Sequence, residues 1–351
     1  MPAIGKHART TVFAPRLQAL LQEHRGSDVF RLDATTVGVA GPEIMDRVLA
    51  ARYATEFERP TFKPLHGRSI PRTDAAKLMQ AVGRDVRLAL KEPVPTGVDF
   101  TGEWPGVGHV YLRDMLLGHD PLRLRFLMDR VLELTPKLTW AVIVTGALSS
   151  LKLGPEASAI ASLTAQASTY DDRRYAMGLY RRTVAPVCFT ISTLVANAMW
   201  LGAPFDDGDS NVNIIHESMR LLPPSWNILR NASPEYAALD ARIGEKDDVL
   251  VLPLVSHRDP ALWDDPDVFR PERWNDLDPD NHPGYLPFGH ASERCWGRHM
   301  VMPLAERLLD MLRSNGLGVS PRQTTAKVPL AGLLGVDGVK IVHIASPGRR
   351  V

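Results

Sequence analysis

One cysteine in a glycine-rich loop constrains this chain more than any other feature. Residues 286–300, LPFGHASERCWGRHM, place Cys295 just before an amphipathic pattern that predicts a helix through Leu312. The free N–H groups and the positive dipole end of a helix N-terminus stabilise a thiolate. Cys295 is therefore a candidate anionic metal ligand, and the alternative is a half-buried structural cysteine.

Composition argues against several other classes of protein. The 351 residues carry 41 Lys and Arg against 40 Asp and Glu, without the basic excess of a nucleic-acid-binding or membrane-surface protein. Cys188 is the only other cysteine, which leaves too few for a disulfide framework and indicates a reducing compartment. No apolar stretch resembles a signal peptide or approaches the ~20 residues of a membrane span. We expect a cytoplasmic protein that binds neither nucleic acid nor membrane.

Hydrophobic periodicity predicts a helical middle with β structure towards both ends. Residues 28–40 alternate β-branched and polar side chains, which predicts a hairpin or strand pair, and a helix follows from Pro42. Apolar positions at helical spacing recur at residues 74–91, 110–117, 122–134 and 156–200. After residue 223 Pro, Gly and Asp become dense, and short apolar runs follow. The prediction is a mainly α protein with a smaller β portion (α+β).

Two further motifs lie upstream of the cysteine loop. Glu217 and Arg220 stand one helical turn apart in HESMRLLPPSW, and SHRDPALWDDPDVFRPERW, residues 256–274, contains Arg273. With the loop, they resemble the haem-binding half of a cytochrome P-450, which has an E-x-x-R helix, a meander and the haem loop F-x-x-G-x-R/H-x-C-x-G. The matching loop residues are Phe288, Gly289, Cys295 and Gly297. Residues 28–49 also resemble the family's first sheet and the helix after it.

The resemblance implies an atypical, shortened bacterial-type member with a cytochrome P-450-like fold. Haem b would lie between a long distal helix and the proximal loop, with the Cys295 thiolate on the iron. Residues 1–351 would form a single haem-binding domain. Its parts would be a β-rich portion at about 28–40, a helical lobe at about 42–222, a haem-binding half at about 217–312 and a C-terminal β hairpin at about 317–345.

Further roles follow from the same resemblance. Glu217, Arg220 and Arg273 would form a structural ion-pair triad, Phe288 would pack against the porphyrin, and Gly297 would let the chain run close beside it. Gly289 belongs to the same cofactor-binding loop.

The haem propionates need cations. Arg230 occupies the family's usual position for one, but Glu293 stands where the loop usually has Arg or His. Arg294 is the candidate replacement, and His290 or His299 could help.

The distal helix departs from the family's A-G-x-D/E-T motif. The best alignment places APVCFTISTLVANAMW there, so that Cys188 replaces the acid and Phe189 replaces the threonine. A one-residue slip places Thr190 at the alcohol position instead. These three residues are the candidate catalytic positions of a site without its usual proton relay.

The function implied is a haem-thiolate oxidoreductase, a monooxygenase acting on a small, mainly apolar organic molecule, in a tailoring step of a biosynthetic pathway. Electrons would come from a separate ferredoxin or flavoprotein reductase. The first alternative is a peroxide-using, oxidative-coupling or rearrangement catalyst of the same fold. The second, from another class, is a non-catalytic haem-binding scaffold or sensor, which the lost acid and alcohol would fit.

Overall fold

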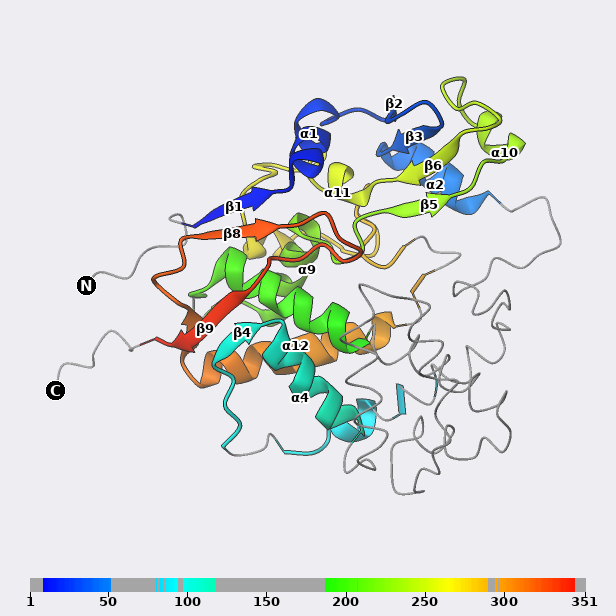
Figure 1. Cartoon of the computed structure of the whole chain (residues 1–351). Helices are drawn as coiled ribbons and strands as arrows, with labels where there is room; N and C mark the ends of the chain where they lie inside the picture. The colour runs from blue at the N-terminus through cyan, green and yellow to red at the C-terminus, as the bar shows by residue number, and fades with distance from the viewer. Residues whose placement is uncertain are drawn as a thin grey trace, which may run out of the picture.

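The structure, a computed structural model, describes residues 9–51, 80, 83–84, 86–93, 97–117, 187–206, 208–289, 294–295 and 297–344. Residues 187–202 are helical and are called the 187–202 helix. The other elements, shown in Figure 1, are in chain order β1 (Thr10–Phe13), α1 (Pro15–Glu23), β2 (Val29–Arg31), β3 (Thr36–Val39), α2 (Pro42–Ala50), β4 (Gly102–Trp104), α4 (Gly106–Leu117), α9 (Asn211–Leu221), β5 (Ile228–Arg230), α10 (Pro234–Ala237), β6 (Asp248–Val251), α11 (Pro253–Ser256), η2 (Pro271–Asn275), α12 (Arg298–Ser314), β7 (Leu317–Val319), β8 (Thr325–Val328) and β9 (Val339–His343).

The predicted strand pair at residues 28–40 is confirmed as β2 and β3. They pair antiparallel, with Val29 opposite Val39, within a four-stranded sheet of order β2–β3–β6–β5. Pro42 opens α2, where the missing N–H costs no helical hydrogen bond. The apolar residues of α2 form a core with those of the sheet and are Ile44, Met45, Val48 and Leu49.

The C-terminal strands form a more interleaved arrangement than a simple hairpin at 317–345. β7 pairs antiparallel with β9, but β8 lies between them in the chain and pairs in parallel with β1. On its other edge β9 pairs antiparallel with β4. The first described strand and a strand from the middle of the chain therefore join the C-terminal segment (Figure 1).

The predicted helices are seen in part. The helix predicted at 110–117 is α4, which begins earlier, at Gly106. Of the prediction at 74–91, residues 80, 83–84 and 86–89 are helical. Of the prediction at 156–200, the described residues 187–200 are helical, and the predicted helix at 122–134 lies outside the described residues.

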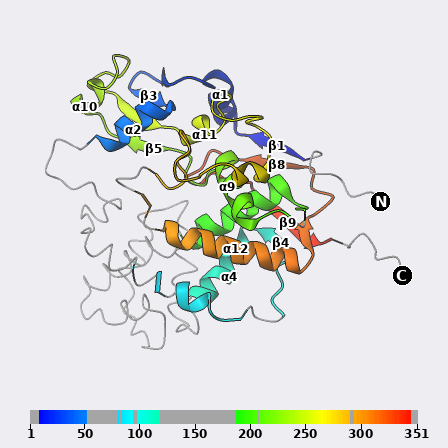
Figure 2. The same ribbon diagram turned by 180° about the vertical axis from the view of Figure 1, so that it is seen from behind.

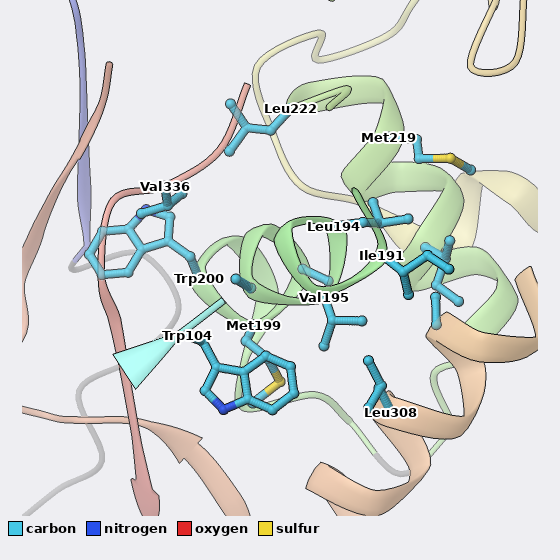
Figure 3. Packing of buried hydrophobic residues seen from close by; sticks show 14 of the residues in the cluster. Trp104, Ile191, Leu194, Val195, Met199, Trp200, Met219, Leu222, Leu308 and Val336 are labelled. Carbon is cyan, nitrogen blue, oxygen red and sulfur yellow. The ribbon is translucent and has the colours of Figure 1, made fainter. Parts of the chain in front are cut away.

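The main core lies around the 187–202 helix, which passes between α9, α12 and the β4 end of the molecule (Figures 2 and 3). Figure 3 shows Trp104, Leu308 and Met219 approaching this helix from β4, α12 and α9. Two buried indoles of this core have their N–H groups paired: Trp104 Nε1 donates to Phe100 O at 3.0 Å, and Trp200 Nε1 donates to the Thr11 hydroxyl at 2.9 Å. The apolar contacts of this core, together with the Trp200–Thr11 hydrogen bond, hold elements from distant parts of the sequence on one helix.

Among the described residues, no helix combines the length and the apolar character needed to cross a membrane.

Replacing Leu308 by Ala should reveal how much this core contributes to stability. Leu308 is fully buried, so the Leu308→Ala variant loses apolar burial and leaves a cavity, at a cost of about 2–5 kcal/mol in the free energy of unfolding. Leu330→Ala is the matched control, because Leu330 is 46% exposed and its loss should cost less than about 0.5 kcal/mol. Urea unfolding measures both, and equal effects would contradict this placement of the core.

Candidate functional site

A buried carboxylate organises the region upstream of the cysteine loop. Glu217, fully buried on α9, accepts hydrogen bonds from Arg220 Nε at 2.9 Å and Arg220 Nη2 at 2.6 Å. Arg273 Nε, from η2, reaches the same carboxylate at 3.2 Å. The Trp274 indole N–H and the Arg270 backbone N–H, both at 3.0 Å, complete its partners. The structure thus brings together the three residues expected to form a triad.

The arginines of this triad also bind the meander backbone. Arg220 Nη1 donates to His257 O at 2.8 Å and to Pro266 O at 2.6 Å. Arg273 Nη1 donates to Asp264 O at 2.9 Å. Because residues 257–268 have little regular secondary structure, these guanidinium contacts satisfy carbonyls that no helix or sheet pairs. The triad therefore fixes the meander on α9.

The cysteine loop is closed by its own backbone. Gly289 has φ +79°, a left-handed conformation that favours glycine, and Cys295 N donates to Phe288 O at 2.7 Å. The bond brings Cys295 beside Phe288, two residues before Gly297, the N-cap of α12. The predicted position of Cys295 just before a helix is confirmed.

The electrostatics of the thiol differ in part from the expectation. Gly297 N donates to Cys295 Sγ at 3.3 Å, and this hydrogen bond lowers the pKa of the thiol. The backbone N–H and the positive charge of Arg298 act in the same direction. Desolvation by the surrounding protein is larger, so the pKa is raised overall although solvent reaches the side chain. The loop alone therefore keeps Cys295 protonated, and a bound cation must supply the rest of the thiolate's stabilisation.

The candidate cofactor-binding residues lie in three places. Phe288 is half-buried and packs against the main core, and half-buried Arg230 ends β5 opposite Val249 of β6. Arg294 Nη1 forms an ion pair with Asp280 Oδ1 at 2.9 Å, so this guanidinium already has a carboxylate partner from the segment between the meander and the cysteine loop. His299 is exposed in the first turn of α12, whereas His290 and Glu293 lie outside the described residues.

The candidate distal residues lie at the N-terminal end of the described part of the 187–202 helix. Cys188 is fully buried, and burial raises its pKa to about 12, so its thiol is a proton-bearing apolar filler at neutral pH. Phe189 lies edge-on to the His109 ring of α4 at 4.2 Å between centroids, and Thr190 is half-buried. The Ser192 hydroxyl donates to Cys188 O at 2.6 Å. None of the positions 188–190 carries a carboxylate.

Sequence reasoning missed two buried polar residues of this region. Asn197 Nδ2 donates to Leu222 O and Leu334 O at 3.0 and 3.1 Å, and its Oδ1 accepts from Val336 N at 2.9 Å. His257 joins α9 to the start of the cysteine loop. A polar residue at an apolar helix position was the available signal for Asn197, and His257 gave no such signal beside the charged residues of the meander.

A cavity of about 870 Å³ lies against α4. It is lined by α4 residues such as Val107, Val110 and Met115, by residues 98–100 and by Arg307. Neither Cys295 nor Cys188 is among the described residues that line it.

The described residues fit a haem held by one cysteine. The Cys295 side chain is accessible to solvent, as a ligand requires. Gly297 has φ −74°, and a Cβ added there would come no closer than 3.5 Å to other protein atoms. Since neither backbone strain nor a protein neighbour requires glycine at 297, the small residue leaves room for a ligand beside the sulfur. The loop carries the donor chemistry of a haem-thiolate site.

The comparisons with known proteins agree with this geometry. The cytochrome P450 family profile matches residues 212–311, which include α9, the meander, the cysteine loop and most of α12. Cyclooctatin synthase of Streptomyces melanosporofaciens is 38% identical over 86 residues, 24% of this chain and 19% of that protein. Cytochrome P450 71D18 of Mentha gracilis is 29% identical over 140 residues, 33% of this chain and 28% of that protein. These matches thus span less than a third of each relative.

Solved structures resemble the chain over most of its length. A 6-coordinated cytochrome P450 from Thermus thermophilus has a TM-score of 0.59 at 16% identity, covering 95% of this chain and 99% of that one. A structure described as one of the unusual cytochrome P450-like monooxygenases of microbial secondary metabolism has a TM-score of 0.60 at 17% identity, covering 93% and 98%. The fold is that of the cytochromes P450. Within that fold, the stretch that carries the site motifs, residues 212–311, is the part that matches the cytochrome P450 family profile.

Removing the charge of Glu217 should destabilise the protein strongly. The Glu217→Gln variant leaves two buried arginines without their counter-charge, which costs about 3–5 kcal/mol in the free energy of unfolding or prevents folding. Glu272→Gln is the control, because the Glu272 carboxylate is 58% exposed and pairs only with Arg270 at the surface. Guanidinium unfolding measures both variants. A loss below about 1 kcal/mol for Glu217→Gln would contradict the role of the triad in folding.

Proposed function

We propose that the protein is a haem-thiolate monooxygenase that oxidises a small, mainly apolar organic molecule. The observation that carries the proposal is the cysteine loop. It closes through the Cys295 N to Phe288 O bond, presents an accessible thiol at the start of α12, and follows a meander fixed by Glu217.

Cys295 is the residue proposed to hold the iron of haem b, and a haem bound through a thiolate would supply oxygen activation and O–O cleavage. Arg230 is the proposed cation for one haem propionate. Arg294 is the second, and the Asp280 carboxylate holds this guanidinium beside the loop. Phe288 and Gly289 shape the loop around the ligand, and Gly297 leaves space at the sulfur.

The surrounding protein affects the protonation state and the charge of the Cys295 sulfur. The raised pKa keeps the free Cys295 thiol protonated, so this proton must leave when a cation binds the sulfur. The Gly297 N–H, at 3.3 Å from Sγ, then donates to the anionic sulfur and tempers its charge. Phe288, packed against the core, covers one side of the loop with an apolar ring.

The side chains at positions 188–190 offer little to move a proton. The Cys188 thiol, with a pKa of about 12, keeps its proton, and Phe189 is apolar. The Thr190 hydroxyl is the one group at positions 188–190 suited to hold a water or a substrate hydroxyl. Water or the substrate itself is therefore the proposed source of protons, and a peroxide-using, coupling or rearrangement reaction is the alternative that this apolar stretch of helix favours.

The substrate class is supported by the relatives. The similar proteins include cyclooctatin synthase, monooxygenases of microbial secondary metabolism, and EryK in complex with erythromycin B. We place the protein in a tailoring step of a biosynthetic pathway. A separate ferredoxin or flavoprotein reductase would supply electrons in the cytoplasm, without a membrane or nucleic-acid partner.

The ligand assignment is tested by the spectrum of the reduced protein with carbon monoxide. We expect the red-shifted Soret band of thiolate-ligated haem in the unmodified protein and its loss in Cys295→Ser, because a serine hydroxyl replaces the thiolate. Cys188→Ala is the control and should retain the band, since Cys188 is buried in the helix core. A band unchanged in Cys295→Ser would overturn the assignment, and its absence from the unmodified protein would overturn the proposed function.

The mechanism is tested by turnover of apolar candidate substrates under two regimes. We expect product with reduced ferredoxin and oxygen, and none from Cys295→Ser in the same assay. Product with hydrogen peroxide alone would favour the peroxide-using alternative. Haem binding without product in either regime would favour the scaffold or sensor.

A further inference from the structure

His257 makes two hydrogen bonds that join three separate parts of the haem-binding half. It follows α11 directly, and its side chain is fully buried. Its Nδ1 lies 3.2 Å from the backbone carbonyl of Arg220 at the end of α9, and its Nε2 accepts from Leu286 N at 3.1 Å. Leu286 lies two residues before Phe288, where the cysteine loop closes.

The partners of His257 define its protonation state. Leu286 N–H is a donor, so Nε2 must carry a lone pair, and the Arg220 carbonyl is an acceptor, so Nδ1 must carry the proton. The ring is therefore neutral. Burial, followed by the nearby Arg220 charge, lowers the pKa of His257 to about 3, and His282, after the meander, acts in the same direction. A cationic His257 would lose its contact with Leu286.

A second contact fixes the preceding residue on the same helix. The Tyr285 hydroxyl donates to His216 O on α9 at 3.1 Å, and His216 Nδ1 lies 3.0 Å from this hydroxyl. Tyr285 is therefore held by its side chain and Leu286 by its backbone. At the other end of the loop, Arg294 is held by Asp280, and Cys295 by Phe288 O.

We propose that His257 is a positioning residue for Cys295. It fixes Leu286, and with it the segment of the loop whose carbonyl at Phe288 holds the Cys295 backbone. The claim that His257 helps to place Cys295 as a haem ligand rests on the proposed haem-thiolate function. The claim that His257 holds the Cys295 backbone through Leu286 and Phe288 is independent of that function.

Two variants of His257 separate its two hydrogen bonds. Asn places its amide near the position of Nδ1, so His257→Asn keeps a donor for Arg220 O and leaves Leu286 N–H without its acceptor. Gln places its carbonyl near the position of Nε2, so His257→Gln keeps the acceptor for Leu286 and loses the donor. Each variant loses one buried hydrogen bond, so a purely structural role for His257 predicts similar effects. His282→Gln is a third variant, since its ring stacks on Trp263 at 4.0 Å without bonding Leu286.

Amide hydrogen exchange of the 351-residue chain without added haem tests the link directly. We expect His257→Asn to speed exchange at the Leu286 and Cys295 amides by about tenfold relative to His257→Gln, with no change at either amide in His282→Gln. Equal exchange in the Asn and Gln variants, or an unaffected Cys295 amide in His257→Asn, would overturn the proposal.

The haem-loaded protein provides the second readout. We expect the fraction with the red-shifted Soret band to fall in His257→Asn and to stay near the unmodified level in His257→Gln. If the exchange result holds and the band is equal in both variants, His257 positions the loop without affecting the ligand, and its assignment as a positioning residue for ligation is wrong. A missing band in the unmodified protein would contradict only the proposed function. The link from His257 to Cys295 would still be tested by hydrogen exchange at the Cys295 amide.

Discussion

The carboxylate of Glu217 is the constraint on which the haem-binding half depends. One buried negative charge faces two arginines, so the cluster holds an excess positive charge that water does not reach. The carbonyls of His257, Asp264, Pro266 and Val268 offset that excess by accepting from the guanidinium groups. The ion pairs and the meander thus require each other. The arginines would be under-solvated without the carbonyls, and the carbonyls would be unpaired without the arginines.

This dependence explains how an irregular segment can support a precise site. The meander, residues 256–274, begins at the last residue of α11 and has η2 as its regular element, yet it leads towards the cysteine loop with its carbonyls paired and its indoles packed. Trp274 serves twice, donating to Glu217 and packing against Tyr285 with 4.6 Å between ring centroids. Rigidity at the start of the loop therefore comes from side chains that reach the backbone rather than from a sheet ladder.

Much of this half could be predicted from sequence because its signals are local. Glu217 and Arg220 lie on one helical turn, Pro42 marks a helix start, and the spacing of Gly289, Cys295 and Gly297 identifies a loop before a helix. The short strands β1, β4 and β8 could not be predicted in the same way. Each has three or four residues and exists because a partner far away in the sequence pairs with it.

The roles of individual site residues depend on tertiary contacts that no local pattern encodes. Arg294 carries the right charge for a propionate, but only the fold shows that Asp280 pairs with it. Helix position correctly suggested backbone donors for Cys295, but the overall pKa depends on desolvation by residues from elsewhere in the chain. Since the protein leaves this thiol protonated, binding of the cation must also meet the cost of removing the proton. A loop already held by Phe288 O, Asp280 and His257 reduces the remaining cost, because little backbone freedom is left to lose when the ligand binds.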